Sequence, residues 1–401
     1  MKGKLTIALL LLGLQLFAGW EAFSPTGIRA NRIRFFVDDH NWAICHQGGV
    51  YLFNLNTQVW TNHPTPSILG ALDAAWLNGD SILVALGSYS NSDGIYSLNP
   101  LTGEYYLIEW IDDPHFVLYD ADHSQYFCGG HNGLMHSENG IDWISLNYFL
   151  NKNIVDLAVY GDYCVASEID NLYRIHVSND GGENWIETPG APMIFDLEFD
   201  LNGKLYGIFP DESYSSGLWS SYDHGVTWNV EFWETGINCV GTDYMNYVFV
   251  GYGENAQLPH EGIARWDSLS QQLYLINDGL SNLVINQITY NPALSMPAIF
   301  CCTDTGVFVN HDYLGIALPE MPEYSLTAWP NPAGDVLTIE SGISENAEIR
   351  IYSIGGRLMD ILDLPENTRR TDYRCSHLEP GSYILQVCYG KERKCIKWVK
   401  R

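Results

Sequence analysis

The stretch Gly49-Val50-Tyr51 is the first of seven related phrases, each with Gly or Asn, then an aliphatic residue, and usually an aromatic third. The other six are Gly94-Ile95-Tyr96, Gly133-Leu134-Met135, Asn171-Leu172-Tyr173, Gly217-Leu218-Trp219, Gly262-Ile263-Ala264 and Gly306-Val307-Phe308. Successive phrases lie 45, 39, 38, 46, 45 and 44 residues apart. A period of about 40–45 residues built from short strands is typical of a four-stranded propeller blade. The sequence therefore predicts an all-β, seven-bladed β-propeller.

The fourth unit shows the expected strands most clearly. Residues 156–160, 163–167, 172–176 and 185–188 are short runs rich in aromatic and β-branched residues, bounded by Gly, Asn and Asp. The seventh unit ends near Leu318, before a fourth strand is evident. We expect the segment 28–36 to supply or overlap a strand there and so to close the ring.

Charge is distributed unevenly along the chain. The formal net charge is -28, yet the stretch from residue 35 to 349 holds only four Lys and Arg, whereas eleven lie from Arg350 onward. Nucleic-acid affinity depends on Lys and Arg that displace counterions, and anionic lipid surfaces attract the same residues. The central region is therefore not expected to bind nucleic acid or a membrane surface.

The N-terminus has the pattern of a secretory leader. Lys2 and Lys4 precede an apolar run over residues 5–17, which is too short to span a bilayer. We expect a signal peptide over residues 1–22, cleaved near residues 18–22, with no transmembrane segment left after cleavage. A retained signal anchor is the alternative.

The cysteines indicate packing more than disulfide bonding. Cys45, Cys128, Cys164, Cys301 and Cys302 fall in equivalent apolar strands, so we expect them to be buried and reduced. The total of nine is odd, which a fully paired disulfide framework would not be. Cys388 and Cys395 flank a hairpin turn, and the sequence leaves their pairing open.

Three turns between the third and fourth strands of a unit carry a second motif. Its residues are Ser137, Asn139 and Trp143; Ser178, Asp180, Gly182 and Trp185; and Ser221, Asp223, Gly225, Thr227 and Trp228. In such a turn the Asp or Asn side chain accepts hydrogen bonds from backbone N–H groups, and the Gly adopts a conformation that other residues disfavour. We interpret these residues as structural.

The pattern Ser-x-Asp-x-Gly-x-Thr-Trp, complete from Ser221 to Trp228, resembles the Asp-box of a class of β-propellers that includes sialidases and sortilin-like receptors. The resemblance covers roughly residues 30 to 320. It implies a propeller whose Asp-box turns lie on the outer rim. It implies no particular chemistry, because Asp-boxes occur in enzymes and in receptors alike.

The last eighty residues or so differ in composition from the repeats. Pro-rich sequence follows residue 318, and alternating strands separated by Pro-Gly turns predict a small immunoglobulin-like β-sandwich over residues 321–401. Four short blocks follow one another along this region. They are Trp329-Pro330-Asn331-Pro332-Ala333, Gly355-Gly356-Arg357, Pro380-Gly381-Ser382-Tyr383 and a final strand over residues 395–400.

These blocks resemble the C-terminal sorting domain (type A) of proteins exported by the type IX secretion system of one group of Gram-negative bacteria. The resemblance implies that the type IX machinery is a partner and guides the chain across the outer membrane. The protein would then be secreted or attached to the outer-membrane surface. A generic adhesive sandwich domain is the alternative.

The sequence contains no complete catalytic set. A sialidase needs three Arg for its substrate carboxylate, but the propeller offers only Arg174 and Arg265 within the repeats, with Arg29, Arg32 and Arg34 before them. A glycoside hydrolase needs two acids about 5 to 10 Å apart, which no spacing in a propeller reveals. A pair of buried acids with raised pKa in the axial cleft would favour such an enzyme.

No metal or cofactor is expected from the motifs. His115, His123, His131 and His136 lie within 22 residues, but their spacings match no zinc motif. The sequence has no phosphate-binding Gly loop and no nucleophile elbow.

Binding is the function that remains. Loops between the second and third strands, and loops between blades, gather on one face around the axis of a propeller. The ligand-binding candidates on that face are Tyr89, His131, Glu168, Tyr214, His260 and Asp304. We predict an exported propeller, over residues 23–320, that binds a glycan or protein without turnover. The alternatives are an Asp-box glycoside hydrolase acting on extracellular polysaccharide and a structural surface component.

Overall fold

The structure is a computed structural model in which residues 19–36, 41–54, 57, 59–66, 69–77, 81–87, 92–169, 173–209, 217–243, 245–253, 261–291, 298–311, 326–331, 333–341, 347–353, 358–365, 368, 370–389 and 392–401 are described. In these residues the regular structure is strand, apart from one short 3-10 helix, η1 (Asn147–Phe149). The all-β class predicted from the sequence is confirmed.

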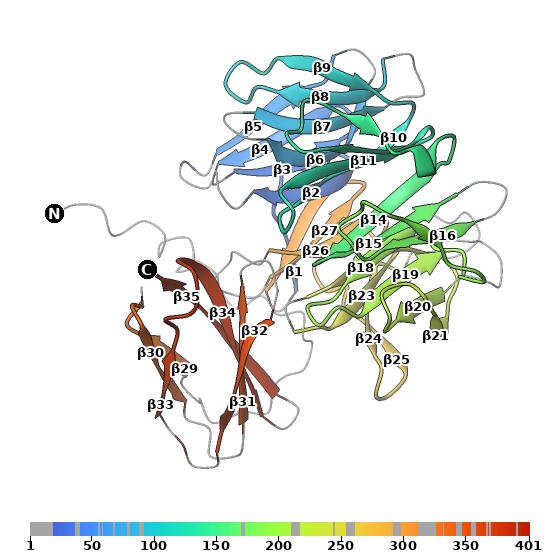
Figure 1. Cartoon of the computed structure of the whole chain (residues 1–401). Helices are drawn as coiled ribbons and strands as arrows, with labels where there is room; N and C mark the ends of the chain where they lie inside the picture. The colour runs from blue at the N-terminus through green and yellow to red at the C-terminus, as the bar shows by residue number, and fades with distance from the viewer. Residues whose placement is uncertain are drawn as a thin grey trace.

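The described strands between Trp20 and Asn310 form seven four-stranded antiparallel sheets (Figure 1). The first sheet has β2 (Ala30–Phe36), β3 (Asn41–His46), β4 (Gly49–Asn54) and β5 (Val59–Pro64). The second has β6 (Gly70–Leu77), β7 (Ser81–Gly87), β8 (Gly94–Leu98) and β9 (Tyr105–Trp110). The third has β10 (Pro114–Asp120), β11 (Gln125–Gly130), β12 (Gly133–Ser137) and β13 (Ile144–Ser145).

The next three sheets repeat the same order. The fourth has β14 (Ile154–Tyr160), β15 (Tyr163–Glu168), β16 (Arg174–Ser178) and β17 (Ile186–Glu187). The fifth has β18 (Asp196–Phe199), β19 (Leu205–Phe209), β20 (Gly217–Ser221) and β21 (Asn229–Trp233). The sixth has β22 (Ile237–Thr242), β23 (Val248–Tyr252), β24 (Ile263–Asp267) and β25 (Gln272–Leu275).

The seventh sheet combines the two ends of the repeat region. It has β26 (Ile285–Tyr290), β27 (Ile299–Thr303) and β28 (Gly306–Asn310), and its fourth strand is β1 (Trp20–Ala22). β1 pairs antiparallel with β28, with Trp20 opposite Asn310.

This pairing corrects two expectations. Residues 30–36 do not complete the seventh sheet, because they form the first strand of the first sheet. Trp20–Ala22, which the sequence analysis assigned to the leader, belongs to the propeller. A strand of three residues is too short to show a period in the sequence, and this one directly follows an apolar leader.

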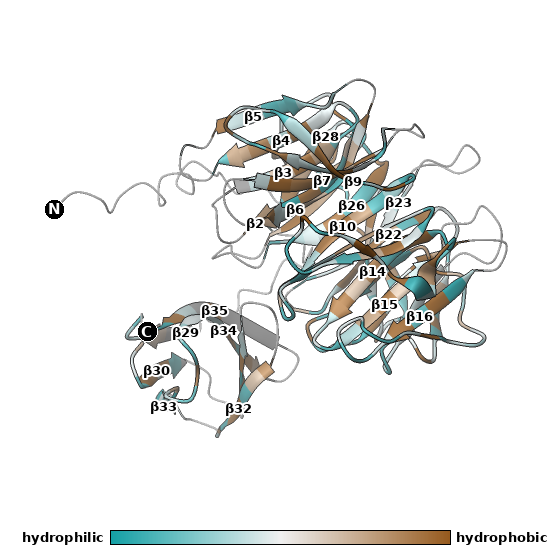
Figure 2. Cartoon of the chain, turned by 45° about the horizontal axis from the view of Figure 1, so that its top comes forward, coloured by the Kyte–Doolittle hydropathy of each residue, from teal (hydrophilic) through white to brown (hydrophobic). Residues whose placement is uncertain are grey.

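The first strands of the sheets surround a common axis. β2, β6, β10, β14, β18, β22 and β26 each contact the next in this order, and β26 contacts β2, so the ring is closed. Apolar side chains fill the space between neighbouring sheets; Ile33, Trp42 and Phe300, for example, pack together where the first and seventh sheets meet. Figure 2 shows these apolar residues along strands such as β3 and β14. Burial between adjacent sheets is what stabilises a β-propeller.

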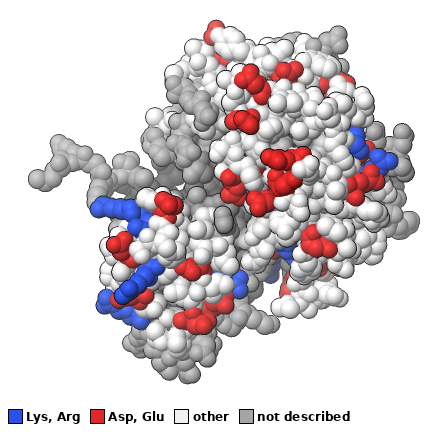
Figure 3. All heavy atoms as spheres, viewed as in Figure 1, with Lys and Arg blue, Asp and Glu red and all other residues white. Residues whose placement is uncertain are grey.

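The C-terminal region folds into two further sheets. One has β29 (Leu326–Trp329), β30 (Val336–Ser341) and β33 (Arg370–Arg374). The other has β31 (Ala347–Ser353), β32 (Leu358–Leu364), β34 (Gly381–Tyr389) and β35 (Glu392–Lys400). The two sheets share a core that includes Ile351, Leu385 and Trp398, as expected for a sandwich. Figure 3 shows Lys and Arg gathered on this domain, whereas the visible face of the propeller carries mainly Asp and Glu.

The cysteines behave as small buried apolar residues. Cys45, Cys128, Cys164, Cys301 and Cys302 are buried and free, as predicted. The pairing of Cys388 with Cys395 stays open, because the side chain of Cys395 lies outside the described residues. No helix among the described residues is long and apolar enough to cross a membrane.

Candidate ligand-binding site

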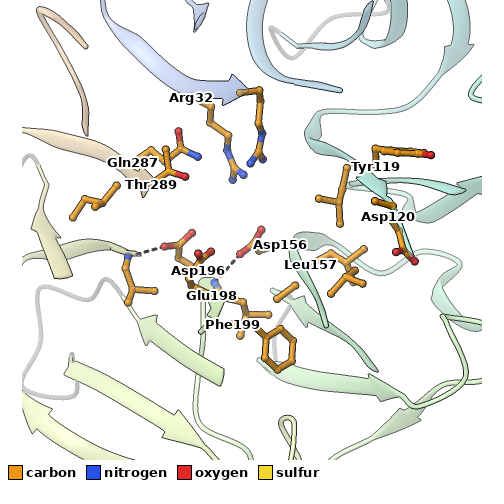
Figure 4. Close-up of a pocket in the computed structure, with 18 of the residues that line it drawn as sticks. Arg32, Tyr119, Asp120, Asp156, Leu157, Asp196, Glu198, Phe199, Gln287 and Thr289 are labelled. Carbon is orange, nitrogen blue, oxygen red and sulfur yellow. Dashed lines mark hydrogen bonds between the residues drawn. The ribbon is translucent and has the colours of Figure 1, made fainter. Parts of the chain in front are cut away.

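A polar pocket of about 320 Å³ lies where the first strands converge on the axis (Figure 4). Its lining comes from β2, β10, β14, β18, β22 and β26, and from the turn that follows β10. Its volume is in the range of small-molecule sites in proteins. The residues that give it chemical character are Arg32, Arg34, Tyr119, Asp120, Asp122, Asp156, Asp196, Glu198, Phe199, Asn286, Gln287 and Thr289.

One wall of the pocket is cationic. Arg32 and Arg34 alternate with apolar Ile33 on β2, so both point toward the axis while Ile33 packs between sheets. Asp73, fully buried on β6, holds Arg34 in a bidentate pair with Nε–Oδ1 and Nη2–Oδ2 distances of 2.7 Å. Arg32 approaches Asp73 less closely, with its Nη1 at 3.5 Å from Oδ2. Arg34 thus ties the first two sheets together, and Arg32 has N–H groups to offer a ligand.

The opposite wall is acidic, as Figure 4 shows. Asp156 lies on β14, and Asp196 and Glu198 lie two residues apart on β18. The Asp156 Oδ2 accepts a hydrogen bond of 2.7 Å from the Leu197 N–H, and the Asp196 Oδ2 accepts one of 2.8 Å from the Val240 N–H. Each of these aspartates therefore links its own sheet to the next one around the ring.

The pKa values of these three acids are raised. Burial raises the pKa of Asp196 to about 7, and the neighbouring Asp156 charge adds to the effect. Burial raises the pKa of Glu198 to about 8, with Asp196 and Asp156 contributing. The pKa of Asp156 is also raised by burial, although Arg32 opposes the shift. Near neutral pH part of this wall is therefore protonated, and its carboxyl groups can donate as well as accept hydrogen bonds.

Amide groups complete the rim between the two charged walls. The Gln287 Oε1 accepts a hydrogen bond of 2.8 Å from the Ile33 N–H, which closes the ring between the seventh and first sheets. The Asn286 Nδ2 donates to the Ala30 carbonyl at 2.9 Å. Phe199 and Leu157 add apolar surface. The pocket thus offers donors, acceptors and an apolar face, a combination suited to a small polar ligand with several hydroxyl or amine groups.

The ligand-binding candidates predicted from the sequence lie elsewhere. His131, Glu168 and Asp304 are on the third, fourth and seventh sheets, and none of them lines the axial pocket. No hydrogen bond or ion pair found among the described residues joins these three to one another. Tyr89, Tyr214 and His260 lie outside the described residues.

Glu168 belongs to a buried network on the fourth sheet. Its Oε2 accepts hydrogen bonds from Lys152 Nζ at 2.8 Å and from His176 Nε2 at 2.7 Å, and Arg174 Nη1 lies 3.5 Å from its Oε1. Burial alone would raise the pKa of Glu168, but the hydrogen bonds from Lys152 and His176 outweigh it and hold the pKa low. Tyr148 OH meets the far nitrogen of His176 at 3.1 Å. The Glu168 carboxylate is therefore engaged within its own blade.

His131 lies beside a carboxylate, and Asp304 lies beside a guanidinium group. His131 Nδ1 lies 3.3 Å from Asp113 Oδ2, and His115 packs beside the His131 ring. Asp304 pairs with Arg29 Nε at 3.1 Å and accepts a hydrogen bond from Asn286 Nδ2 at 3.1 Å. Asp304 thus reaches the edge of the axial site through Asn286, whereas His131 is part of a separate group.

The three Ser-x-Asp turns share one hydrogen-bond pattern. The Asp223 carboxylate accepts from the Thr227 N–H and hydroxyl, both at 2.7 Å, and Ser221 Oγ accepts from the Gly225 N–H at 2.8 Å. The Trp228 indole N–H donates back to the Gly225 carbonyl. The turns at Asp180 and Asn139 repeat these bonds. Because the carboxylates are used up locally, these turns offer a structural motif and no free reactive group.

The sequence analysis missed the acids and arginines of the pocket. Asp196 and Glu198, like Arg32 and Arg34, alternate with apolar residues on the first strand of a unit. First strands are enclosed on both faces, so charged residues at every second position are unexpected there. An alignment of the first strands of the seven units shows this signal, whereas the loops between strands do not.

Comparisons with known proteins agree with this architecture. Residues 327–401 match the family described as secretion system C-terminal sorting domain. The match confirms the sorting domain predicted from the sequence, and with it export of the protein to the cell surface by type IX secretion. No curated protein matches the chain.

Two solved structures resemble the fold. PorZ, an essential bacterial surface component of the type-IX secretion system of Porphyromonas gingivalis, gives a TM-score of 0.53 at 14% identity, covering 94% of this chain and 60% of PorZ. This chain therefore spans 60% of the PorZ chain. The β-propeller domain of Myceliophteria thermophila Cps50 (Swd1) gives a TM-score of 0.53 at 14% identity, covering 72% of this chain and 99% of that domain. These structures show the β-propeller fold, and the family match shows the sorting domain, so the chain is an exported β-propeller protein with a C-terminal sorting domain.

Proposed function

We propose that this exported propeller binds a glycan in its axial pocket without turning it over. The observation that carries the proposal is the pocket itself, with Arg32 on one wall and Asp156, Asp196 and Glu198 on the other. Sugar hydroxyls both donate and accept hydrogen bonds, so they suit a site that mixes guanidinium, carboxyl and amide groups. The net charge of -28 favours a neutral or amine-bearing glycan over an anionic one.

The ring gives such a site a rigid frame. Asp156 and Asp196 are fixed by backbone N–H groups of the next sheet, and Gln287 is fixed by the first sheet. Groups held before binding lose little conformational entropy when the ligand arrives. A purely structural surface component would need no pocket of this kind.

The test is a glycan-array screen of the mature chain, followed by calorimetric titration of the glycans that bind. We expect Asp196→Asn to weaken binding at least tenfold, because a hydrogen bond to a charged group contributes about 1.5–3 kcal/mol. The Asn oxygen can still accept the Val240 N–H, so the ring is kept. His131→Ala is the control on the loop face, because His131 lies outside the lining of the axial pocket, and it should bind as the wild type does.

Three results would contradict the proposal. If His131→Ala lost affinity and Asp196→Asn did not, the ligand would bind at the loop face. If the array gave no binding at all, a protein ligand or a structural role would replace the glycan. If mass spectrometry found cleaved glycans, the protein would be an enzyme.

Hydrolysis is the second candidate, because Asp196 and Glu198 are a pair of buried acids with raised pKa in the axial pocket, the feature expected above to favour a glycoside hydrolase. In that case Glu198→Gln should abolish cleavage and retain binding. The wild-type chain should release a reducing sugar from the bound glycan. Unaltered glycans after prolonged incubation would rule this candidate out.

A further inference from the structure

A second group of polar side chains lies on the third sheet, outside the lining of the axial pocket. It consists of Asp113, just before β10, His115 in β10, and His131 in the turn between β11 and β12. One donor atom from each side chain lies within 4.8 Å of the other two. None of the three residues lines the axial pocket.

The backbone brings these residues together by two local irregularities. The β10–β11 register shifts between Pro114 and Phe116, so His115 is the extra residue of a β-bulge. Bulges redirect a side chain out of the ladder. Asp113 has a φ of 46°, in the left-handed region that residues other than Gly rarely adopt.

The orientation of His115 is fixed by a residue outside the group. Its Nε2 lies 2.9 Å from the Asn153 Oδ1. An amide oxygen can only accept, so Nε2 carries the hydrogen and Nδ1 keeps its lone pair. Histidines that bind metals commonly donate their other N–H to an oxygen in this way. Asn153 thus holds the His115 ring as a metal ligand is usually held.

The buried charge of Asp113 also favours a metal ion at this site. The residue is only 6% exposed. In the described part of the chain its ion-pair partner is His131, at 3.3 Å, and no Lys or Arg pairs with it. A buried carboxylate without a full positive charge nearby is costly. A divalent cation between Asp113 and the two imidazoles would supply that charge.

We propose that Asp113, His115 and His131 bind a divalent transition-metal ion of the zinc type. Two imidazoles and one carboxylate form a set that such ions prefer, and three protein ligands leave a position open for water or another small ligand. Zinc bonds of about 2.0–2.2 Å need ligand atoms about 3.4 Å apart in a tetrahedron. The donor atoms here lie within 4.8 Å of one another. The side chain of His131 is 49% exposed, so it is free to move inward to the closer spacing that zinc needs.

The experiment uses the full mature chain, freed of metal with a chelator and then titrated with Zn²⁺ by calorimetry. We expect one equivalent to bind, and Co²⁺ in its place to give visible absorption bands of a low-symmetry site. His131→Ala should lower the affinity at least tenfold. Asn153→Ala, which removes only the group that orients His115, should lower it about 10- to 100-fold.

The matched control is His377→Ala in the sorting domain. His377 is 55% exposed and lies 2.9 Å from Asp360, so it resembles His131 but lacks a third ligand. Its replacement should leave Zn²⁺ binding unchanged. Far-ultraviolet circular dichroism and the melting temperature show whether each variant is folded. The proposal is wrong if the folded wild type binds no Zn²⁺, or if folded His131→Ala binds as tightly as His377→Ala.

Discussion

Glu198 shows how a single residue of the axial pocket ties stability to pH. Its ordinary pKa of 4.5 rises to about 8 in the folded chain because burial and two nearby aspartates oppose its charge. The folded state therefore holds this proton more tightly than the unfolded state. The stability that the proton provides is complete below pH 4.5 and is lost as the pH rises through about 8.

Glu198→Gln should remove this dependence, since glutamine never becomes charged. We expect the melting temperature of the variant to exceed that of the wild type increasingly from pH 5 to pH 8.5. Differential scanning calorimetry across that range measures the difference. The exposed Glu183→Gln is the control and should show a constant difference. An equal difference at all pH values for Glu198→Gln would show that the carboxyl group is not held neutral.

For single residues, the sequence predicted the hydrogen bonds within a turn well, but it did not predict which distant residues lie close together in space. The Asp223 turn followed from adjacent residues, since all its hydrogen bonds lie within seven positions. The opposition of Arg32 and Glu198 depends on strands more than 160 residues apart in the chain. No local sequence pattern indicates that residues so far apart in the chain face each other across the pocket. The candidates from the loops were predicted from their place on one face of the propeller, which does not report what lines the axis.

The strand β1 is the element on which closure of the ring depends. Trp20 is 3% exposed and packs in a core with Phe249, Ile285 and Phe308. Its indole N–H donates to the Ile276 carbonyl, and its backbone N–H donates to Asp278. The first and last parts of the repeat region are thus joined by the three residues of β1. A cut after residue 22, the far end of the expected cleavage window, would remove them.

Two measurements test this role of β1. Mass spectrometry of the mature protein should place its N-terminus at or before Trp20. Trp20→Ala should destabilise the propeller by about 3–5 kcal/mol in denaturant unfolding, as large-to-small changes of a buried Trp do. Trp110→Ala is the control, because Trp110 is 46% exposed, and should cost about 0.5 kcal/mol or less. A mature chain that begins at Phe23 would contradict the assignment.

The seven sheets themselves were accessible to sequence reasoning because they repeat. A period of 38 to 46 residues is a long-range signal that survives substitutions in any one unit. The bulge at His115 has counterparts near the start of the first strand in five other sheets, so it does not by itself mark the third sheet. Only the side chains that stand at and around it differ, and no local pattern shows that they meet. The sequence therefore predicted the ring and missed the cluster that the bulge creates.

In the described part of the chain, the apolar core of the sorting domain shares no residues with the seven clusters of the propeller. The sorting domain is built around Ile351, Leu385 and Trp398, whereas the propeller clusters contain only residues from 20 to 309. The two regions also differ in charge, with basic residues concentrated in the sorting domain. Separate cores joined by a chain segment should unfold separately.

Calorimetry of the full chain should accordingly show two thermal transitions. Leu385→Ala, at a fully buried site of the sorting domain, should destabilise one transition by about 2–5 kcal/mol and leave the other unchanged. Leu83→Ala, equally buried in the propeller, should do the reverse. If both substitutions lowered one common transition, the sorting domain would be an integral part of the propeller's folding unit. Independent transitions would mean that the sorting domain can direct export of a propeller that folds without it.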